Sequence, residues 1–354
     1  MLELARESRR LTQAQLAEAA GLAQGTVSKL EGGLLEPQGD TLTAIAEVLR
    51  YPEEFFTRQT EPPARLLPRE MATLPARDRR AVVASMKIRC LELSELLRSV
   101  EIPDVKVPRL CLHRDVGSPS DAATRIRELW RIPAGPINNL TTLLEDHGIV
   151  VIAEDFGVSG MYGLSQSSSN SPDLPPLIVI NSSSPGDRIR FTMAHELGHH
   201  VLHHHEHATV ASEDCEEEAN EFSSAFLMPE RDIAGQFHSR ITLEELASLK
   251  QHWKVSMQAL LVRGQSLGRI PHAHATRLWK RISMLGYRRN EPVEVAYDQP
   301  TLLGDIIEEY RTGLEYSNDE LSALIKLHPD EFGERYLGIK KGLRLLRDWK
   351  PPGG

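Results

Sequence analysis

Seven of the chain's fourteen histidines lie within thirteen residues, in the segment HELGHHVLHHHEH at 195–207. The residues before it provide Ser184 as a helix cap, then a proline and an acid in the first turn, and so predict a helix over about 186–203. His195 and His199 are one helical turn apart and therefore share one face. Two imidazoles in this arrangement can bind one metal ion.

Glu196 is rotated by about 100° from His195 around the helix axis and is not expected to be a ligand. It can instead reach a water molecule at an open position of the metal, as in the H-E-x-x-H arrangement, where zinc acidifies the water and the glutamate accepts its proton. The alternative is a helix with surface histidines. Buried imidazoles and carboxylates cost several kcal/mol unless they are paired or coordinated. The residues around the motif are apolar and favour the metal site over that alternative: Phe191, Ala194, Leu197 and Val201.

A third ligand is expected from a second helix, predicted in SEDCEEEANEFSSAFLMP. Its packing stripe consists of Ala219, Phe222, Ser223 and Phe226. Glu216 lies on the side of the small residues of this stripe and is the predicted third ligand. Glu217 and Glu218 are turned about 100° and 200° away and are expected to be solvated, with Glu217 as the second choice of ligand.

His205 is a rival third ligand, because it has the H-E-x-x-H-x-x-G-x-x-H spacing of another class of zinc proteases. That class needs a glycine to turn the chain out of the helix, and here Leu202 occupies the position. The other histidines are expected at the helix end or in the next loop, where cations suit the helix dipole: His200, His203, His204 and His207. Cys215 is a further competing ligand, although Cys90, Cys111 and Cys215 are expected to be reduced thiols, two of them in cores.

The segments RFTMAHELGHH and EEEANEFSSAFLMP together resemble the ImmA/IrrE family of metallopeptidases, which pairs H-E-x-x-H with a later stretch containing E-x-x-A-N and L-M-P. The resemblance covers about residues 120–265. It implies zinc or manganese bound by His195, His199 and Glu216, with Glu196 as the catalytic glutamate. It also implies cleavage of a repressor or antitoxin protein.

The N-terminal segment LTQAQLAEAAGLAQGTVSKLEGGLLEP resembles the Xre-type, lambda-repressor-like helix-turn-helix. This resemblance implies a first motif helix over 12–19, a turn at Gly21 and a recognition helix over 24–30. Leu16, Val27 and Leu30 suit its core. The expected DNA contacts are Gln24 with adenine, Thr26 and Ser28 with bases or phosphate, and Gln13 and Lys29 with phosphate.

The charge of this segment limits its affinity for DNA. Residues 1–60 contain six basic and nine acidic residues, and the whole chain has a formal charge of -9. Phosphate neutralisation supplies most non-specific affinity, so a monomer is expected to bind an operator weakly. Binding would need a homodimer or help from RLWKRISMLGYRRN at 277–290, which contains five basic residues and no acidic one. The alternative is a helical module that recognises protein.

We expect a mainly α chain with four parts. Residues 1–57 are expected to form the helix-turn-helix domain, and residues 58–110 a linker and a long amphipathic helix over about 76–99. Residues 111–265 are expected to form a small α+β zincin-like metallopeptidase domain, and residues 266–354 a helical region. Three strands are predicted in IVVIAEDF, GMYGLSQ and LIVIN. Late in the chain, YSNDELSALIKLHPDEF has the pattern of helix, turn and helix. Its expected role is plain helical packing or dimerisation, and the alternative is a second, degenerate Xre-like unit.

No stretch approaches the roughly 18 uninterrupted apolar residues of a membrane helix, and the first residues, MLELARESRRLTQ, are charged. The expected location is therefore the cytoplasm, with no membrane partner.

The leading hypothesis is a DNA-binding transcriptional regulator that carries a zinc metalloendopeptidase and cleaves a partner repressor or antitoxin. The strand LIVIN is expected to offer an edge on which an extended substrate segment pairs. The first alternative is a transcription factor whose metal site is sensory or structural. The second is an antitoxin or phage-type control protein that uses both domains only for binding.

Overall fold

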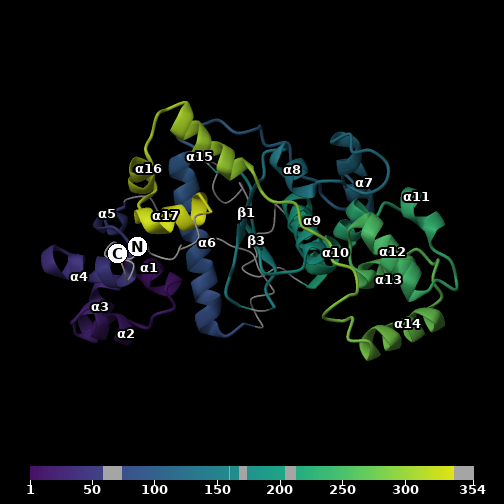
Figure 1. Ribbon diagram of the computed structural model, residues 1–354, viewed down its shortest axis with the longest axis horizontal. Helices are drawn as coiled ribbons and strands as arrows, with labels where there is room; N and C mark the ends of the chain where they lie inside the picture. The colour runs from purple at the N-terminus through teal and green to yellow at the C-terminus, as the bar shows by residue number, and fades with distance from the viewer. Residues whose placement is uncertain (59–73, 159, 167–173, 204–212, 339–354) are drawn as a thin grey trace, which may run out of the picture. The chain divides into compact units, whose positions relative to one another are not determined.

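The computed structural model describes residues 1–58, 74–158, 160–166, 174–203 and 213–338. The chain forms two compact units: the first combines residues 1–62, 83–101 and 303–354, and the second combines residues 63–82 and 102–302. Most described residues are helical and the strands form a single small sheet (Figure 1), which confirms the predicted mainly α fold with a small α+β part.

The first unit begins with the helices α1 (Leu2–Ser8), α2 (Gln13–Ala19), α3 (Gln24–Glu31), α4 (Gly39–Leu49) and α5 (Glu53–Phe56). Thr12 caps α2 through a capping box with Gln15, and Gly21 has a positive φ of 66° in the turn before α3. The predicted core residues are buried: Leu16, Val27 and Leu30. These features form the helix-turn-helix that the sequence predicts.

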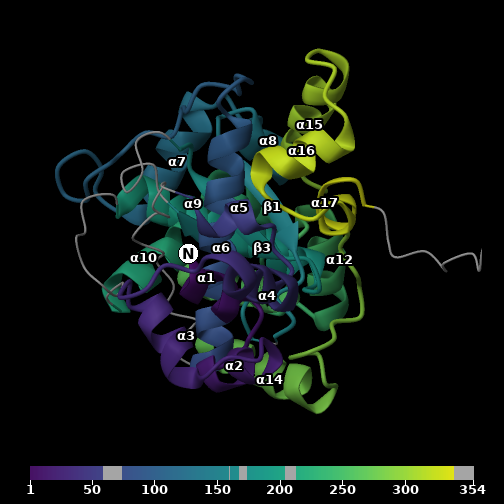
Figure 2. The same cartoon turned by 90° about the vertical axis from the view of Figure 1, so that its left-hand side faces the viewer.

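Segments from the middle and the end of the chain complete the first unit. They are α6 (Ala76–Leu96) from Val83 onward, α15 (Leu302–Thr312), α16 (Asn318–Ile325) and α17 (Pro329–Tyr336), the last three drawn in yellow in Figures 1 and 2. The hydroxyl of Tyr310 donates to the Leu96 carbonyl at 2.9 Å, which ties α15 to α6.

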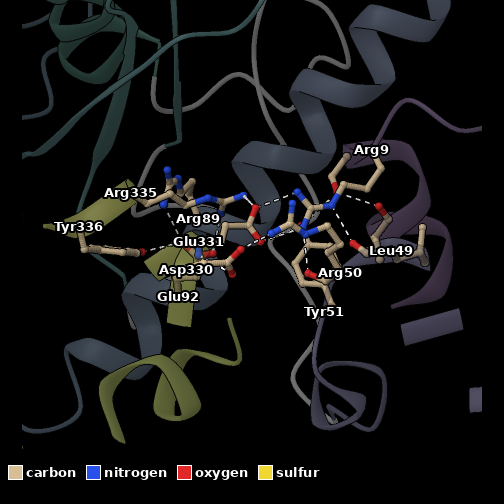
Figure 3. A network of polar contacts seen from close by, with 12 residues as sticks. Arg9, Leu49, Arg50, Tyr51, Arg89, Glu92, Asp330, Glu331, Arg335 and Tyr336 are labelled. Carbon is tan, nitrogen blue, oxygen red and sulfur yellow. Dashed lines mark hydrogen bonds and ion pairs between the residues drawn. The ribbon is translucent and has the colours of Figure 1, made fainter. Parts of the chain in front are cut away.

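A network of ion pairs joins α17 to the helix-turn-helix domain (Figure 3). The Arg9 guanidinium donates to both carboxylate oxygens of Glu331 at 2.8 Å, and Arg50 pairs with Asp330. Arg335 binds Glu331 at 2.7 Å. On α6, the buried carboxylate of Glu92 accepts hydrogen bonds from Arg335 at 3.1 Å and from Tyr336 at 2.6 Å. Bidentate, partly buried pairs of this kind are stronger than exposed ones.

Helices α16 and α17 repeat the local geometry of α2 and α3. Ser317 caps α16 through a capping box with Glu320, as Thr12 does for α2. Lys326, nine residues after Ser317, has a positive φ of 61°, and Gly21 stands nine residues after Thr12. In both motifs the second helix begins twelve residues after the cap. The structure thus confirms the helix, turn and helix predicted in YSNDELSALIKLHPDEF.

The sheet of the second unit consists of β1 (Val150–Glu154), β2 (Gly163–Gln166) and β3 (Leu177–Asn181), in the order β1-β3-β2. β1 is parallel to β3 with Val150 opposite Leu177, and β2 is antiparallel with Gly163 opposite Ile180. All three predicted strands are present. The expectation that LIVIN offers a free edge is wrong, because β3 is the central strand. Its fully buried, apolar sequence is typical of that position.

Two helices precede the sheet in the chain, α7 (Pro119–Leu129) and α8 (Leu140–Glu145), and two follow it, α9 (Gly186–Leu202) and α10 (Glu213–Leu227). Helices α9 and α10 lie side by side (Figure 1). α9 begins after Pro185 without a side-chain cap, so the predicted capping role of Ser184 is wrong. A Cβ atom on Gly198 would lie 3.3 Å from the Ala219 Cα, so the missing side chain allows α9 and α10 to approach closely.

The second unit continues with α11 (Glu230–Ile233), a short 3-10 turn (Ala234–Gln236), α12 (Leu243–Trp253), α13 (Met257–Ser266) and α14 (His272–Met284). The ammonium of Lys250 on α12 binds Asp187 of α9 at 2.6 Å and Glu291 at 2.8 Å, in the interior. This pairing anchors the N-terminal end of α9. Within the described ranges, no helix combines the length and apolar character needed to cross a membrane.

Candidate metal centre

Three predicted ligands come together between α9 and α10. The Nε2 atoms of His195 and His199 are 3.0 Å apart. Oε2 of Glu216 lies 3.4 Å from Nε2 of His195, and its Oε1 lies 3.5 Å from Nε2 of His199. Ligands bound tetrahedrally at about 2.0–2.1 Å are separated from one another by about 3.3 Å. The two imidazoles and the carboxylate therefore have the spacing and the donor atoms that suit a zinc ion.

The protonation states of these residues suit metal binding. Burial lowers the pKa of His199 to about 4, so its imidazole is neutral near pH 7. Burial alone would raise the pKa of Glu216, but hydrogen bonds from His195 and His199 outweigh it and hold the pKa well below its usual range. A neutral imidazole and an ionised carboxylate are the forms that bind metals.

Glu196 lies beside this group without joining it. Its side chain is buried, and its Oε2 accepts a hydrogen bond of 2.5 Å from the Ser165 hydroxyl on β2. Among the residues that the structure describes, the group formed by His195, His199 and Glu216 includes no fourth histidine, cysteine or carboxylate. Sequence reasoning missed Ser165. Its only signal is a polar residue in a short strand, and such a residue does not identify a partner.

Both histidines of the motif have a second hydrogen bond through Nδ1. Nδ1 of His195 lies 3.1 Å from the Asn220 amide oxygen. Nδ1 of His199 lies 2.9 Å from Nδ1 of His203, whose Nε2 lies 2.8 Å from Oε2 of Glu218. Hydrogen bonds of this kind fix the orientation of a metal-binding ring.

These contacts correct two expectations. His203 lies at the end of α9, as predicted, but it is buried and faces the neighbouring helix rather than acting as a cation at the helix dipole. Glu218 was predicted as a solvated charge, but it is bound to His203. The helical phase of α10 alone suggests that Glu218 faces away from Glu216. That phase does not show that α9 ends at His203, where the His203 ring contacts the Glu218 carboxylate. Glu217 is exposed, as predicted.

His200 lies in the last turn of α9, as predicted, but it is not a cation there. Its side chain is buried, and burial lowers its pKa to about 3, so the ring is neutral near pH 7. Cys90 and Cys215 are buried, and burial raises the pKa of the Cys90 thiol to about 12. Cys215 lies in a second group with His203 and Glu218, whose ligand atoms are within 4.8 Å of one another. The rival ligand His205 lies outside the described residues, as do His204 and His207.

The predicted DNA contacts lie on α2 and α3. Gln24, Ser28 and Lys29 on α3 are exposed, whereas Thr26 on α3 and Gln13 at the start of α2 are partly exposed. The side chains of Gln13 and Gln24 are hydrogen bonded to each other at 2.9 Å. Gln13 also donates to Glu31 at 2.8 Å, and Glu31 in turn pairs with Arg6 at 2.6 Å. This chain of contacts fixes the start of α2 against α3.

Comparisons with known proteins agree with this geometry. Residues 2–56 match the family model of a helix-turn-helix, and residues 144–264 match that of the IrrE N-terminal-like domain, peptidase family M78. The second match includes α9 and α10 with all three residues of the metal-binding group. No curated protein matched the chain. The chain is a fusion of an N-terminal DNA-binding helix-turn-helix domain with an IrrE N-terminal-like domain of the M78 peptidase family.

Proposed function

We propose that this protein is a transcriptional regulator whose M78 domain is a zinc-dependent endopeptidase that cleaves a partner repressor or antitoxin. The observation that carries the proposal is the convergence of His195, His199 and Glu216, with the buried carboxylate of Glu196 beside them. The peptidase module is assigned to residues 111–265 and the DNA-binding module to residues 1–57.

His195, His199 and Glu216 would hold the metal, which we assign as zinc because two imidazoles and one carboxylate suit it; manganese is the alternative. When bound, the metal supplies Lewis acidity that polarises the scissile carbonyl and lowers the pKa of the attacking water. The absence of a fourth ligand from this group, among the described residues, supports an open position for substrate.

Glu196 is the proposed general base and acid. Its carboxylate accepts the proton of the attacking water and later transfers that proton to the leaving amide nitrogen. The Ser165 hydroxyl donates to Oε2 of Glu196 and so restricts the carboxylate to one orientation. Because the pair is buried, this hydrogen bond faces little competition from bulk water.

The proposed substrate is an extended or locally unfolded segment of a protein. β2 is an end strand of the described sheet, since it pairs with β3 on one side only, and all four of its residues are buried. Ser165 on β2 contacts Glu196, which brings this strand close to the reacting atoms. A flexible loop of a repressor can supply such an extended segment.

For the DNA-binding module, we propose that Gln24, Thr26 and Ser28 on α3 read the operator, while Gln13 and Lys29 contact phosphate. The acidic balance of residues 1–60 favours binding as a homodimer or with help from the basic segment 277–290.

The test compares the wild type with Glu196→Gln in cells that contain the natural repressors. New N-termini are quantified by mass spectrometry after expression of each form, and zinc content is measured on the purified proteins. We expect Glu196→Gln to retain zinc and to abolish cleavage, because the amide cannot accept the proton. Equal cleavage by both forms would refute the assigned base. Zinc binding without new N-termini in either form would favour a sensory or structural metal site.

A further inference from the structure

Beyond the three proposed ligands, a chain of hydrogen bonds runs from the metal-binding group to the surface. It passes from His199 on α9 through His203 at the end of that helix to Glu218 on α10, with separations of 2.9 Å and 2.8 Å. His203 is 8 % exposed, and the Glu218 side chain is 32 % exposed. The hydrogen bond between His199 and His203 is therefore protected from water, and the hydrogen bond from His203 ends on the charged carboxylate of Glu218.

We propose that His203 and Glu218 are a positioning pair, which fixes the ring orientation and the tautomer of His199 so that its Nε2 faces the metal. This inference rests on the proposed function, because it assumes that His199 is a ligand. Neither His203 nor Glu218 belongs to the group of His195, His199 and Glu216.

The proton positions follow from the donors and acceptors. A neutral imidazole carries one proton, on one of its two ring nitrogens. When Nε2 of His199 binds a metal, its proton is on Nδ1 and is donated to Nδ1 of His203. Nδ1 of His203 must then be the acceptor, so the proton of His203 is on Nε2. That proton is donated to the Glu218 carboxylate.

The same count of protons decides against a second metal in the group formed by His203, Cys215 and Glu218. A metal on Nε2 of His203 would move the proton of that ring to Nδ1. Two N–H groups would then face each other across the 2.9 Å between His199 and His203, and neither could accept. A metal on His199 and a metal on Nε2 of His203 therefore exclude each other, and we infer that these two described groups together hold one metal ion.

His199 is connected to an anionic carboxylate through His203. An anionic end of such a chain makes the metal-binding nitrogen more basic. Loss of Glu218 should therefore weaken metal binding through His199.

The first test measures zinc affinity by competition with a chelator for three variants of the full-length protein. We expect Glu218→Ala to weaken zinc binding about 10- to 100-fold, and Glu218→Gln, which keeps an acceptor oxygen, to recover part of that loss. The matched control is Glu217→Ala, because Glu217 is the exposed neighbour on the same helix and should leave the affinity unchanged. Equal affinities for Glu218→Ala and Glu217→Ala would overturn the proposal.

The second test detects the tautomers directly, by long-range 1H–15N correlation on 15N-histidine protein loaded with zinc. We expect the proton of His199 on Nδ1 and that of His203 on Nε2, and we expect the His203 signal to change in Glu218→Ala. A proton on Nδ1 of His203 in the loaded wild type would overturn the assignment.

The last test separates this inference from the proposed function and from a second metal site. We expect one zinc per chain in the wild type and in Cys215→Ser, and loss of zinc in His195→Ala. Zinc retained by His195→Ala would refute the proposed metal centre itself. Two zinc ions per chain, one of them lost in Cys215→Ser, would refute the positioning pair and leave the first centre intact.

Discussion

The hydroxyl of Ser165 and the carboxylate of Glu196 form one of the shortest contacts in the interior, at 2.5 Å. Glu196 gains a fixed orientation from this bond, because a carboxylate otherwise rotates freely about its last side-chain torsion. The strand β2 thus contacts the proposed base, which lies 31 residues later in the chain than Ser165.

Replacement of Ser165 by alanine tests this role. We expect zinc content to stay unchanged and kcat to fall roughly 10- to 100-fold with little change in KM, because a hydrogen bond to a charged group is worth about 1.5–3 kcal/mol. The measurement is steady-state cleavage of the substrate found from the new N-termini, with the exposed Ser248→Ala as control. A Ser165→Ala enzyme with wild-type kcat would exclude this role.

At this scale, the helical period predicted the position of each proposed ligand. The four-residue spacing places His195 and His199 on one face, and the phase of α10 distinguishes Glu216 from Glu217. The contacts of His203 and Ser165 could not be predicted in this way. They depend on where α9 ends and on which strand packs against it, and neither is encoded in the period of a single helix.

At the scale of elements, α17 binds the helix-turn-helix domain through charges rather than through an apolar face alone (Figure 3). Burial alone would raise the pKa of Glu331, but hydrogen bonds from Arg9 and the charge of Arg335 outweigh it and lower the pKa to about 2. The usual value is 4.5, so folding favours the ionised form.

This shift predicts how stability depends on pH. The contribution of Glu331 is fully present above about pH 4.5 and is lost as the pH falls toward 2, since the folded form must then be protonated. We expect Glu331→Gln to lower the free energy of unfolding of the first unit by an amount on the order of 2–3 kcal/mol at pH 7, and by much less near pH 2. Hydrogen exchange of amides in α4 and α17 measures this difference.

The exposed Glu18→Gln on α2 is the matched control and should have little effect at either pH. A Glu331→Gln difference that is as large at pH 2 as at pH 7 would contradict the assigned pKa.

Strand and helix positions in the second unit followed from local patterns, including the three strands and the H-E-x-x-H helix. The order of the strands in the sheet did not follow from local patterns. LIVIN has the apolar sequence of a strand that is covered on both faces, but the identity of its two neighbours depends on long-range pairing. The expectation of a free edge at LIVIN was therefore wrong, and β2 is the end strand beside Glu196.

At the scale of the whole molecule, the first unit is assembled from three separate parts of the chain. Glu92 on α6 is 1 % exposed and accepts hydrogen bonds from Arg335 and Tyr336, which are more than two hundred residues later. The sequence predicted the two fused domains because each contains a local motif. It gave no sign that the last helices belong with the first, since ion pairs between distant segments leave no periodic pattern.

Removal of residues 303–354 tests this assembly. We expect the first unit to lose its cooperative unfolding transition in calorimetry and its affinity for DNA, because removal of a partner from a buried charge costs about 3–5 kcal/mol. Zinc binding should persist, since all three proposed ligands lie in the second unit. An unchanged transition for residues 1–58 would show that the helix-turn-helix is stable without α15–α17.

Metal analysis of purified protein tests the central claim most directly, that Glu216 joins His195 and His199 around a single ion. One zinc per chain is expected in the wild type and in Glu217→Ala, and far less than one in Glu216→Ala. Full zinc content in Glu216→Ala would contradict the metal centre and the peptidase activity built on it.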